Sequence, residues 1–364
     1  MDKKTVWSLV WKIVKWPLWV ILFLGGISLL VWVILSYGYS APWTGFNKTK
    51  IDNPANYQPV KLLWDWLQLL IIPIFLTLAG WIYSVLQKQT DYKLAKEKEN
   101  SVVLQAYFDS MKDLIVDGKL MDTKNDPDHP VRALARSKTI TTLQMIDDER
   151  KKAVLNFLSH AGLIKLDQPV IMLDELELNH VNFQNLRLTF VDLKSIVFKS
   201  ANLTKAKIEN CNLSLGDFSE AMARGSHFTY SVLKGVNFFN ADLEGTDLSK
   251  AELVSANLQK TKLKKSNLSG SNLAGAKLQG SDFSEAMLDS CIFSNYDDSA
   301  GGRTRIQNTI FRKANLTKAQ FRGIDFSQGV DFTGAVLDEA DFSGSNITQN
   351  EINKAKSKLG VILP

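Results

Sequence analysis

Residues 248–273 read LSKAELVSANLQKTKLKKSNLSGSNL, with a leucine at every fifth position after the first. A period of five fits neither the 3.6 residues of a helical turn nor the two-residue alternation of a strand. Self-similarity at a short fixed period is typical of repeat proteins, in which each unit buries its apolar face against its neighbours. This stretch therefore predicts a solenoid.

The same period extends along the chain in both directions. An apolar residue occupies every fifth position from Leu173 to Phe293, which gives 25 centres, and Ala223 is the only small one. The period resumes at Ile306 for five centres, slips by one residue before Phe332 and continues for four more, so the total is 34. The position two residues before most centres holds a small side chain, as at Ala201, Ala251 and Ser271.

The blocks ANLTK, ADLEG and SNLSG resemble the pentapeptide-repeat family, whose repeat is A(D/N)LXX, over residues 171–347. The resemblance implies a right-handed quadrilateral β-helix with four repeats, or 20 residues, in each coil and with the centres facing inward. We place this β-helix at residues 165–347, with an insertion at 294–305. The segment 133–164 is similar to a cap found in membrane-linked bacterial members of the family, often cyanobacterial ones.

With 20 residues in each coil, residues 20 apart lie in one column, about 4.8 Å from one another. Phe198, Phe218 and Phe238 should then stack. Cys211 and Cys291 are four coils apart, too far for a disulfide. The two cysteines and four scattered histidines form no metal-binding spacing, so we predict no metal site.

The N-terminal quarter of the chain is much more apolar. Residues 16–37 and 66–86 are uncharged runs of 22 and 21 residues, and about 20 residues of helix cross a bilayer. Lysines before the first run and after the second predict that both termini are cytoplasmic. We therefore expect a cytoplasmic segment at 1–15, two transmembrane helices joined by an exoplasmic loop at 38–65, and integral localisation in a bacterial plasma or thylakoid membrane.

Helical periodicity and turn residues predict an α-helical connector and cap at 87–164. Larger side chains replace the small ones in the first coils, at Ile171, Leu176 and Val181 among others. We expect these side chains to meet the cap. After the repeats, Thr348 and Glu351 form a capping-box pattern that predicts a short helix in a capping segment at 348–364.

The segment SNYDDSAGGRTR, residues 294–305, interrupts the repeats. We interpret the interval from Phe293 to Ile306 as two repeats plus three extra residues. Insertions in solenoids leave the coil as exposed loops, often on the binding side. The hypothesis is that a protein partner contacts Tyr296, Asp297, Asp298, Arg303 and Arg305. A tolerated insertion without function is the alternative.

Charge limits the functions that the solenoid could have. The net charge of +5 belongs to residues 1–164, where it lies beside the apolar runs and is better explained by membrane topology than by nucleic-acid binding. Residues 165–364 carry 23 basic and 23 acidic side chains, so mimicry of DNA toward gyrase is disfavoured. The densest basic cluster is the group of lysines at 260–265. At 20 residues per coil, Lys264 lies one coil from Glu244 and Lys265 one coil from Glu285, so we expect most of this cluster to be neutralised within the solenoid.

No nucleophile motif, phosphate loop or metalloprotease motif occurs, and a filled β-helix offers no interior pocket. We therefore predict no enzyme activity, no catalytic residue and no cofactor. The predicted function is a membrane-anchored scaffold that presents the solenoid to a protein partner. The alternative is a subunit of an oligomeric channel or transport complex that the solenoid regulates.

Overall fold

The computed structural model describes residues 63–295 and 302–364, with side chains from residue 72 onward. The chain divides into two compact units, residues 1–95 and 96–364. The predicted N-terminal segment at 1–15, the first predicted span at 16–37 and nearly all of the predicted loop at 38–65 lie outside the described residues.

A single helix, α2 (Leu63–Val116), contains the second predicted span at 66–86 and continues without a break into a charged stretch. The uncharged run is followed within the same helix by Gln87 and Lys88. None of the described helices is long and apolar enough to span a membrane. This finding contradicts the predicted two-pass localisation with cytoplasmic termini.

Within the second unit, three helical segments follow the end of α2: η4 (Leu120–Asn125), α3 (Pro130–Met145) and α4 (Asp148–His160). Aromatic side chains hold them together, because Phe157 of α4 packs 5.1 Å from Phe108 and 6.3 Å from Tyr107 of α2 between ring centroids. Asp147 caps α4 by accepting a hydrogen bond from the Arg150 amide.

The cap helices join the first coils through polar contacts. Arg132 of α3 is buried and donates from Nε to the Val170 carbonyl at 2.9 Å and from Nη2 to the Pro169 carbonyl at 2.7 Å. Asp148 at the start of α4 accepts a hydrogen bond from the Asn182 amide at 2.8 Å. The large residues that replace small ones in the first coils are all buried at this end of the solenoid: Ile171, Leu176, Val181, Leu186, Val191 and Ile196.

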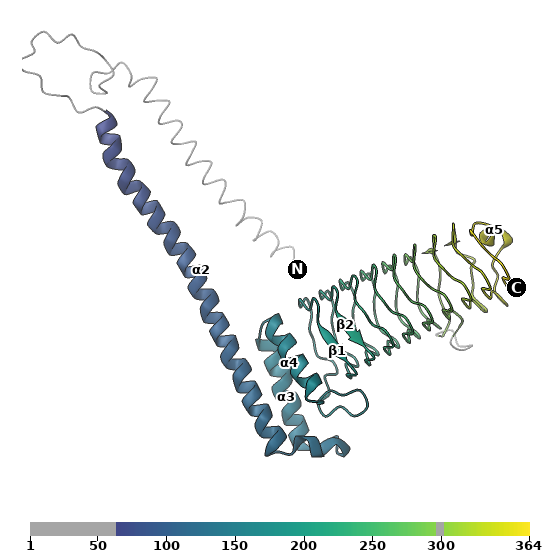
Figure 1. Cartoon of the computed structure of the whole chain (residues 1–364), viewed down its shortest axis with the longest axis horizontal. Coiled ribbons are helices and arrows are strands. Elements are labelled where there is room, and N and C mark those ends of the chain that lie inside the picture. The colour runs from purple at the N-terminus through teal and green to yellow at the C-terminus, as the bar shows by residue number, and fades with distance from the viewer. Residues whose placement is uncertain (1–62, 296–301) are drawn as a thin grey trace, which may run out of the picture. The chain divides into compact units, whose positions relative to one another are not determined.

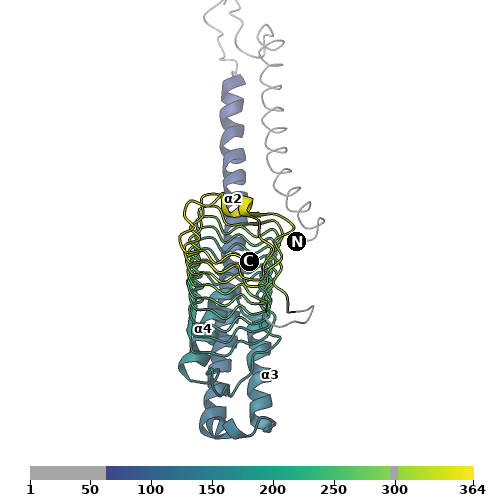
Figure 2. The ribbon, with the colours of Figure 1, turned by 90° about the vertical axis from the view of Figure 1, so that its right-hand side faces the viewer.

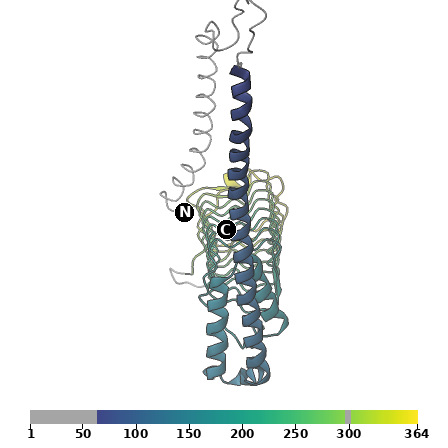
Figure 3. The ribbon, with the colours of Figure 1, turned by 90° about the vertical axis from the view of Figure 1, so that its left-hand side faces the viewer.

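The repeats form a β-helix whose coils stack in parallel, as Figure 1 shows. Around one coil, Asn237 pairs with Asn257, Asp242 with Lys262, and two further parallel bridges complete the turn, so each coil has four faces. Regular strands are short: β1 (Arg187–Thr189) pairs with β2 (Lys207–Glu209), and β3 (Thr309–Ile310) pairs with β4 (Val330–Asp331). Figures 2 and 3 view the stacked coils from the two ends.

The core follows the five-residue period. The ring centroid of Phe218 lies 5.3 Å from that of Phe198 and 5.2 Å from that of Phe238. The predicted aromatic column is therefore confirmed. Polar residues in the small slot are also satisfied, since the Ser231 hydroxyl donates to the Ile208 carbonyl at 3.0 Å. A serine in this slot can therefore be buried without leaving its hydroxyl unpaired.

The corners of each coil have a left-handed backbone. Two residues after nearly every centre the φ angle is positive, as at Lys205 (58°), Gly225 (60°) and Ser255 (57°). A left-handed residue bends the chain sharply enough to begin the next face. These corners repeat along the whole solenoid and make its cross-section uniform.

The insertion changes the ladder spacing once. Lys277 pairs with Arg305, whereas a regular coil would bring position 297 opposite Lys277, so this coil contains eight extra residues. Ile306 is therefore the next centre after Phe293, and the interval between them is one repeat plus eight residues. The interpretation as two repeats plus three residues was wrong, because the apolar spacing alone fits both counts.

Two further features end the solenoid. Asn315 pairs with Val336, one position beyond the partner that a regular coil would give, which accounts for the one-residue slip before Phe332. Helix α5 (Gln349–Ile352) begins with the predicted capping box of Thr348 and Glu351. The ladder then continues, because Asp341 pairs with Ile362, so the coils extend beyond residue 347.

Candidate functional site

The interior of the coils is filled by side chains and offers no reactive group among the described residues. Cys211 and Cys291 are free and buried, and burial raises the pKa of each thiol to about 12. Thiols of that pKa are protonated and poorly nucleophilic at neutral pH. Across residues 63–295 and 302–364, no group of His, Cys, Asp and Glu side chains could hold a metal ion.

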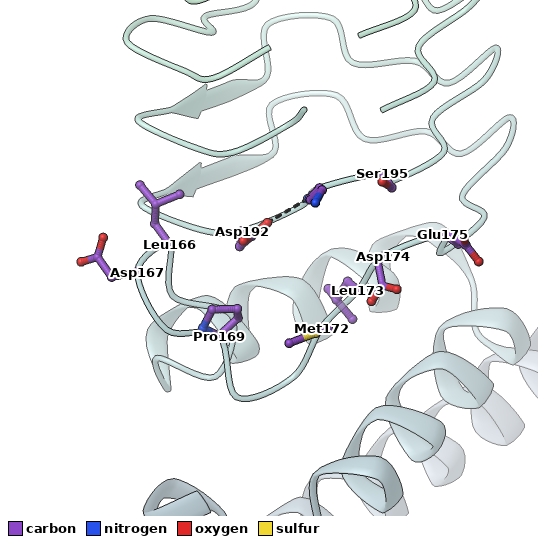
Figure 4. A pocket seen from close by; sticks show the side chains of 10 residues that line it. Leu166, Asp167, Pro169, Met172, Leu173, Asp174, Glu175, Asp192 and Ser195 are labelled. Carbon is purple, nitrogen blue, oxygen red and sulfur yellow. Dashed lines mark hydrogen bonds between the residues drawn. The ribbon is translucent and has the colours of Figure 1, made fainter. Parts of the chain in front are cut away.

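A cavity of about 490 Å³ lies between the segment leading into the first coil and the coil above it (Figure 4). Leu166, Pro169 and Met172 form its apolar part. Two of its carboxylates are already engaged: Asp174 pairs with Arg136 at 3.3 Å, and Asp192 accepts from the Lys194 amide at 2.9 Å. This cavity therefore has the chemistry of a structural junction between cap and coil.

The outer faces of the solenoid differ in charge. On the face that follows the centres Ala223, Leu243 and Leu263, cations and carboxylates alternate from coil to coil. Arg224 pairs with Asp242 at 2.8 Å, and Lys265 pairs with Glu285 at 3.9 Å, the latter as predicted. Lys264 also pairs with Glu285, at 3.8 Å, and not with Glu244 as predicted. Glu244 instead pairs with Arg224, at 3.4 Å. The charges on this face largely cancel.

A second face, which we call the Lys277 face, follows the centres Phe238, Leu258, Leu278 and Ile306. One column of this face contains Asn237, Asn257, Lys277 and Arg305 in successive coils. The adjacent column contains Phe239 and three glutamines, Gln259, Gln279 and Gln307. Between residues 237 and 308, the described part of this face carries no Asp or Glu.

Three cations on this face, Lys260, Lys277 and Arg305, are exposed, and Arg303 is exposed two residues before Arg305. We call these four residues the basic strip. None of the four forms an ion pair with a carboxylate of the described residues. Lys260 instead lies 5.6 Å from the ring centroid of Phe239. The basic strip therefore carries an uncompensated positive charge within the described part of the chain.

The base of the insertion is held firmly at the edge of the Lys277 face. The Thr304 hydroxyl donates to the Ser294 carbonyl at 2.9 Å and accepts from the Gly275 amide at 2.8 Å. Asn295 accepts from the Thr304 amide at 3.1 Å and donates to the Gly323 carbonyl at 3.2 Å. These bonds join three successive coils, so the side chains just after the insertion have a fixed position.

Two of the five residues in the hypothesised partner site are brought onto this surface. Arg305 is part of the ladder, since its amide donates to the Ala276 carbonyl at 3.0 Å, and Arg303 is exposed beside it. Tyr296, Asp297 and Asp298 lie outside the described residues.

Sequence reasoning missed Lys277 and the glutamine column. Counting the insertion as two repeats plus three residues placed Arg305 in the column of Asp282, next to a carboxylate. The ladder places it one coil from Lys277 instead. The signal was available in the sequence, because counting one repeat plus eight residues aligns Arg305 with Lys277 and Gln307 with Gln279.

Two family models describing pentapeptide repeats match the solenoid. One, of eight copies, matches residues 177–214, 217–253, 231–270 and 256–295, and the other, of nine copies, matches residues 311–350. No curated protein matches the sequence.

Solved structures of repeat proteins are also similar to this chain. HetL, a pentapeptide repeat protein involved in heterocyst differentiation regulation from the cyanobacterium Nostoc sp. strain PCC 7120, is 21% identical, with a TM-score of 0.30 over 57% of this chain and 95% of its own. A pentapeptide repeat protein from the Arabidopsis thaliana thylakoid lumen is 26% identical, with a TM-score of 0.20 over 36% of this chain and 66% of its own. At such scores these two alignments carry no argument about function.

Proposed function

This chain belongs to the pentapeptide-repeat family, and from that premise we propose that its solenoid is a non-enzymatic module that binds a protein partner through the Lys277 face. Pentapeptide-repeat proteins are generally structural or interaction proteins without catalytic activity. The partner contacts the exposed side chains of this face and of the insertion base, including Arg303 and Arg305.

The observation that supports this proposal most directly is the exposed basic strip on a face that carries no Asp or Glu among the described residues between 237 and 308. Several surface cations on other parts of the coils do pair with carboxylates, such as Arg312 with Asp331 and Lys318 with Glu339. The backbone under the strip is held by ladder hydrogen bonds, so binding orders few additional groups and loses little conformational entropy. A rigid surface with free polar groups is suited to recognition.

The other functions are less well supported. The channel-subunit hypothesis depended on two membrane spans, and nothing in the described residues favours it. Mimicry of DNA needs an acidic surface, whereas the Lys277 face is positive. The insertion as a tolerated loop without function is the remaining alternative, and the experiment below distinguishes it.

The test uses a bulky side chain that blocks contact without changing charge. Gln307→Trp places an indole on the Lys277 face. Thr317→Trp is the matched control, because both residues immediately follow a centre of the same coil, Ile306 and Leu316, but lie on different faces. Replacing residues 295–304 by a linker would be a poorer test, because it would remove the Thr304 hydrogen bonds to the neighbouring coils.

We expect the wild-type chain and Thr317→Trp to retain the same protein in an affinity purification from the native cell, and Gln307→Trp to lose it. Far-UV circular dichroism and melting temperature should be equal for the two variants. Retention by Gln307→Trp at the wild-type level would overturn the proposed surface. The absence of any retained protein with the wild-type chain would overturn the proposed function itself.

A further inference from the structure

We propose that the Lys277 face recognises an acidic segment of a protein partner, a chain stretch rich in Asp or Glu. This inference rests on the proposed function and adds the chemistry of the partner. It follows from how charge is arranged on the solenoid, because the overall charge of the repeats is balanced.

The charges of the basic strip act together. Lys277 and Arg305 occupy successive positions of one column, and Lys260 lies at the corner of the coil before Lys277. Coils are about 4.8 Å apart, so the positive charges extend over roughly 10 Å along the axis. This length is comparable to the Debye length of about 8 Å at physiological ionic strength. A carboxylate approaching this face is therefore attracted by more than one cation.

The strip is distinguished by the absence of carboxylates from its own face among the described residues between 237 and 308. On the neighbouring face, carboxylates lie among the cations and form ion pairs with several of them: Arg224 with Asp242, and Lys264 and Lys265 with Glu285. On the Lys277 face, the nearest described carboxylates along the ladder lie outside the coils that contain the strip: Asp217 and Glu220 before it, and Asp325 after it. The partner supplies the carboxylates that the solenoid supplies to itself elsewhere.

The glutamine column favours a polypeptide as the occupant. Gln259, Gln279 and Gln307 lie beside the cations, and each amide side chain can both donate and accept a hydrogen bond. An extended acidic peptide offers carboxylates to the cations and backbone amide and carbonyl groups to the glutamines.

A nucleic acid fits this face less well. Single-stranded nucleic acids bind through positive grooves that also present aromatic side chains on which bases stack. The described part of the face offers one outward aromatic side chain between residues 237 and 308, Phe239, and Lys260 lies over its ring. The observations therefore favour an acidic polypeptide, and binding of nucleic acid is an outcome that the experiment can detect.

The experiment measures binding of the full chain to a fluorescently labelled peptide of alternating Glu and Ser by fluorescence anisotropy at low salt, with a Gln/Ser peptide as the uncharged reference. Lys277→Gln/Arg305→Gln removes two charges from the strip. The control, Lys264→Gln/Lys265→Gln, removes the same charge from the neighbouring face. Because all four side chains point outward, both variants should keep the wild-type melting temperature to within a few degrees.

We expect the strip variant to raise the Kd for the Glu/Ser peptide at least tenfold and the control variant to raise it less than threefold. Equal weakening in both variants would mean that only net charge matters and would overturn the proposal. Tighter binding of a thymidine oligonucleotide than of the peptide would overturn it in favour of a nucleic acid. Severalfold tighter peptide binding after Asp297→Asn/Asp298→Asn would assign the strip to the chain's own insertion and also overturn it.

Different experimental results would reject the acidic-partner proposal and the proposed partner-binding function. If the native partner is retained by the wild-type chain and equally by Lys277→Glu/Arg305→Glu, the interaction module stands and the acidic chemistry is wrong. If Gln307→Trp has no effect on retention while the Glu/Ser peptide still requires Lys277 and Arg305, the strip binds carboxylates but is not the partner surface.

Discussion

At the residue scale, the fold depends on one inward position in five. Leu258 is fully buried, and the adjacent Gln259 points outward. Leu258→Asp should place an unpaired charge in a dry core and lower the free energy of unfolding by on the order of 4 kcal/mol, whereas Gln259→Asp should be nearly neutral. Chemical denaturation of the two variants measures the difference. Equal stabilities would contradict the assignment of inward positions.

The left-handed corners give a second prediction at this scale. Ser290 has a φ of 59°, and a side chain with a Cβ in this region costs about 1–2 kcal/mol relative to glycine. Ser290→Gly should therefore raise the free energy of unfolding by up to about 1 kcal/mol, and Ser290→Val should lower it by about 1–2 kcal/mol. Thermal melts of both variants test the sign. A stabilising valine would contradict the left-handed conformation.

The sequence predicts the inward residues well because burial selects apolar side chains at a fixed interval. It also contains an unused signal for the corners. The left-handed positions of the repeats are occupied by Gly, Asn, Ser, Lys, Glu and a few larger residues, but never by Val, Ile or Thr among the described residues. Branched side chains are the least compatible with positive φ, so their absence from one position in five indicates a left-handed turn.

At the element scale, the joint between the cap and the first coil depends on Arg132. Its buried guanidinium donates to the carbonyls of Pro169 and Val170, and more weakly to those of Thr123 and Lys124. Arg132→Met should leave the Pro169 and Val170 carbonyls without the donors they have in the wild type and cost about 2–4 kcal/mol. Hydrogen exchange should then speed up in α3 and the first coil while the last coils stay protected, because repeats are coupled mainly to their neighbours.

Arg136→Met provides the comparison, since Arg136 contacts the next carbonyls along, at Met172 and Asp174, but is partly exposed. It should lose clearly less stability than Arg132→Met. Uniform loss of protection over all the coils after Arg132→Met would contradict a local joint.

A charged contact between neighbouring coils predicts acid sensitivity. Burial alone would raise the pKa of Asp331, but hydrogen bonds from Thr333 and the Arg312 guanidinium lower it to about 2. A carboxyl whose folded pKa is below its ordinary value of about 3.9 stabilises the fold above that value and loses this contribution as pH falls toward 2. The wild-type melting temperature should thus fall more steeply between pH 4 and pH 2 than that of Asp331→Asn. If the melting temperatures of the two proteins fall equally steeply with pH, Asp331 does not make this contribution.

Element boundaries show where sequence reasoning succeeds and fails. The capping box of Thr348 with Glu351, which has a specific sequence pattern, is present at the predicted helix start. The insertion was miscounted because the interval from Phe293 to Ile306 is compatible with two registers. The ladder contact of Lys277 with Arg305 selects one of them, and that contact depends on how much of the chain leaves the coil.

At the scale of the whole molecule, overall charge concealed the candidate surface. Residues 165–364 contain 23 basic and 23 acidic side chains in total, but a single face need not contain equal numbers of the two. Assigning charges to faces requires the correct register through the insertion, which composition does not contain. The predicted membrane localisation was also wrong, because none of the described helices is long and apolar enough to span a membrane.

The central proposal is that one face of the pentapeptide-repeat solenoid binds a protein partner. Its most direct test is photo-crosslinking in the native cell with a benzophenone amino acid at position 307 of the Lys277 face, and at position 317 of the same coil as the matched control. The account predicts a crosslinked protein from position 307 and none from position 317. No crosslink at 307, or the same crosslink from both positions, would contradict it.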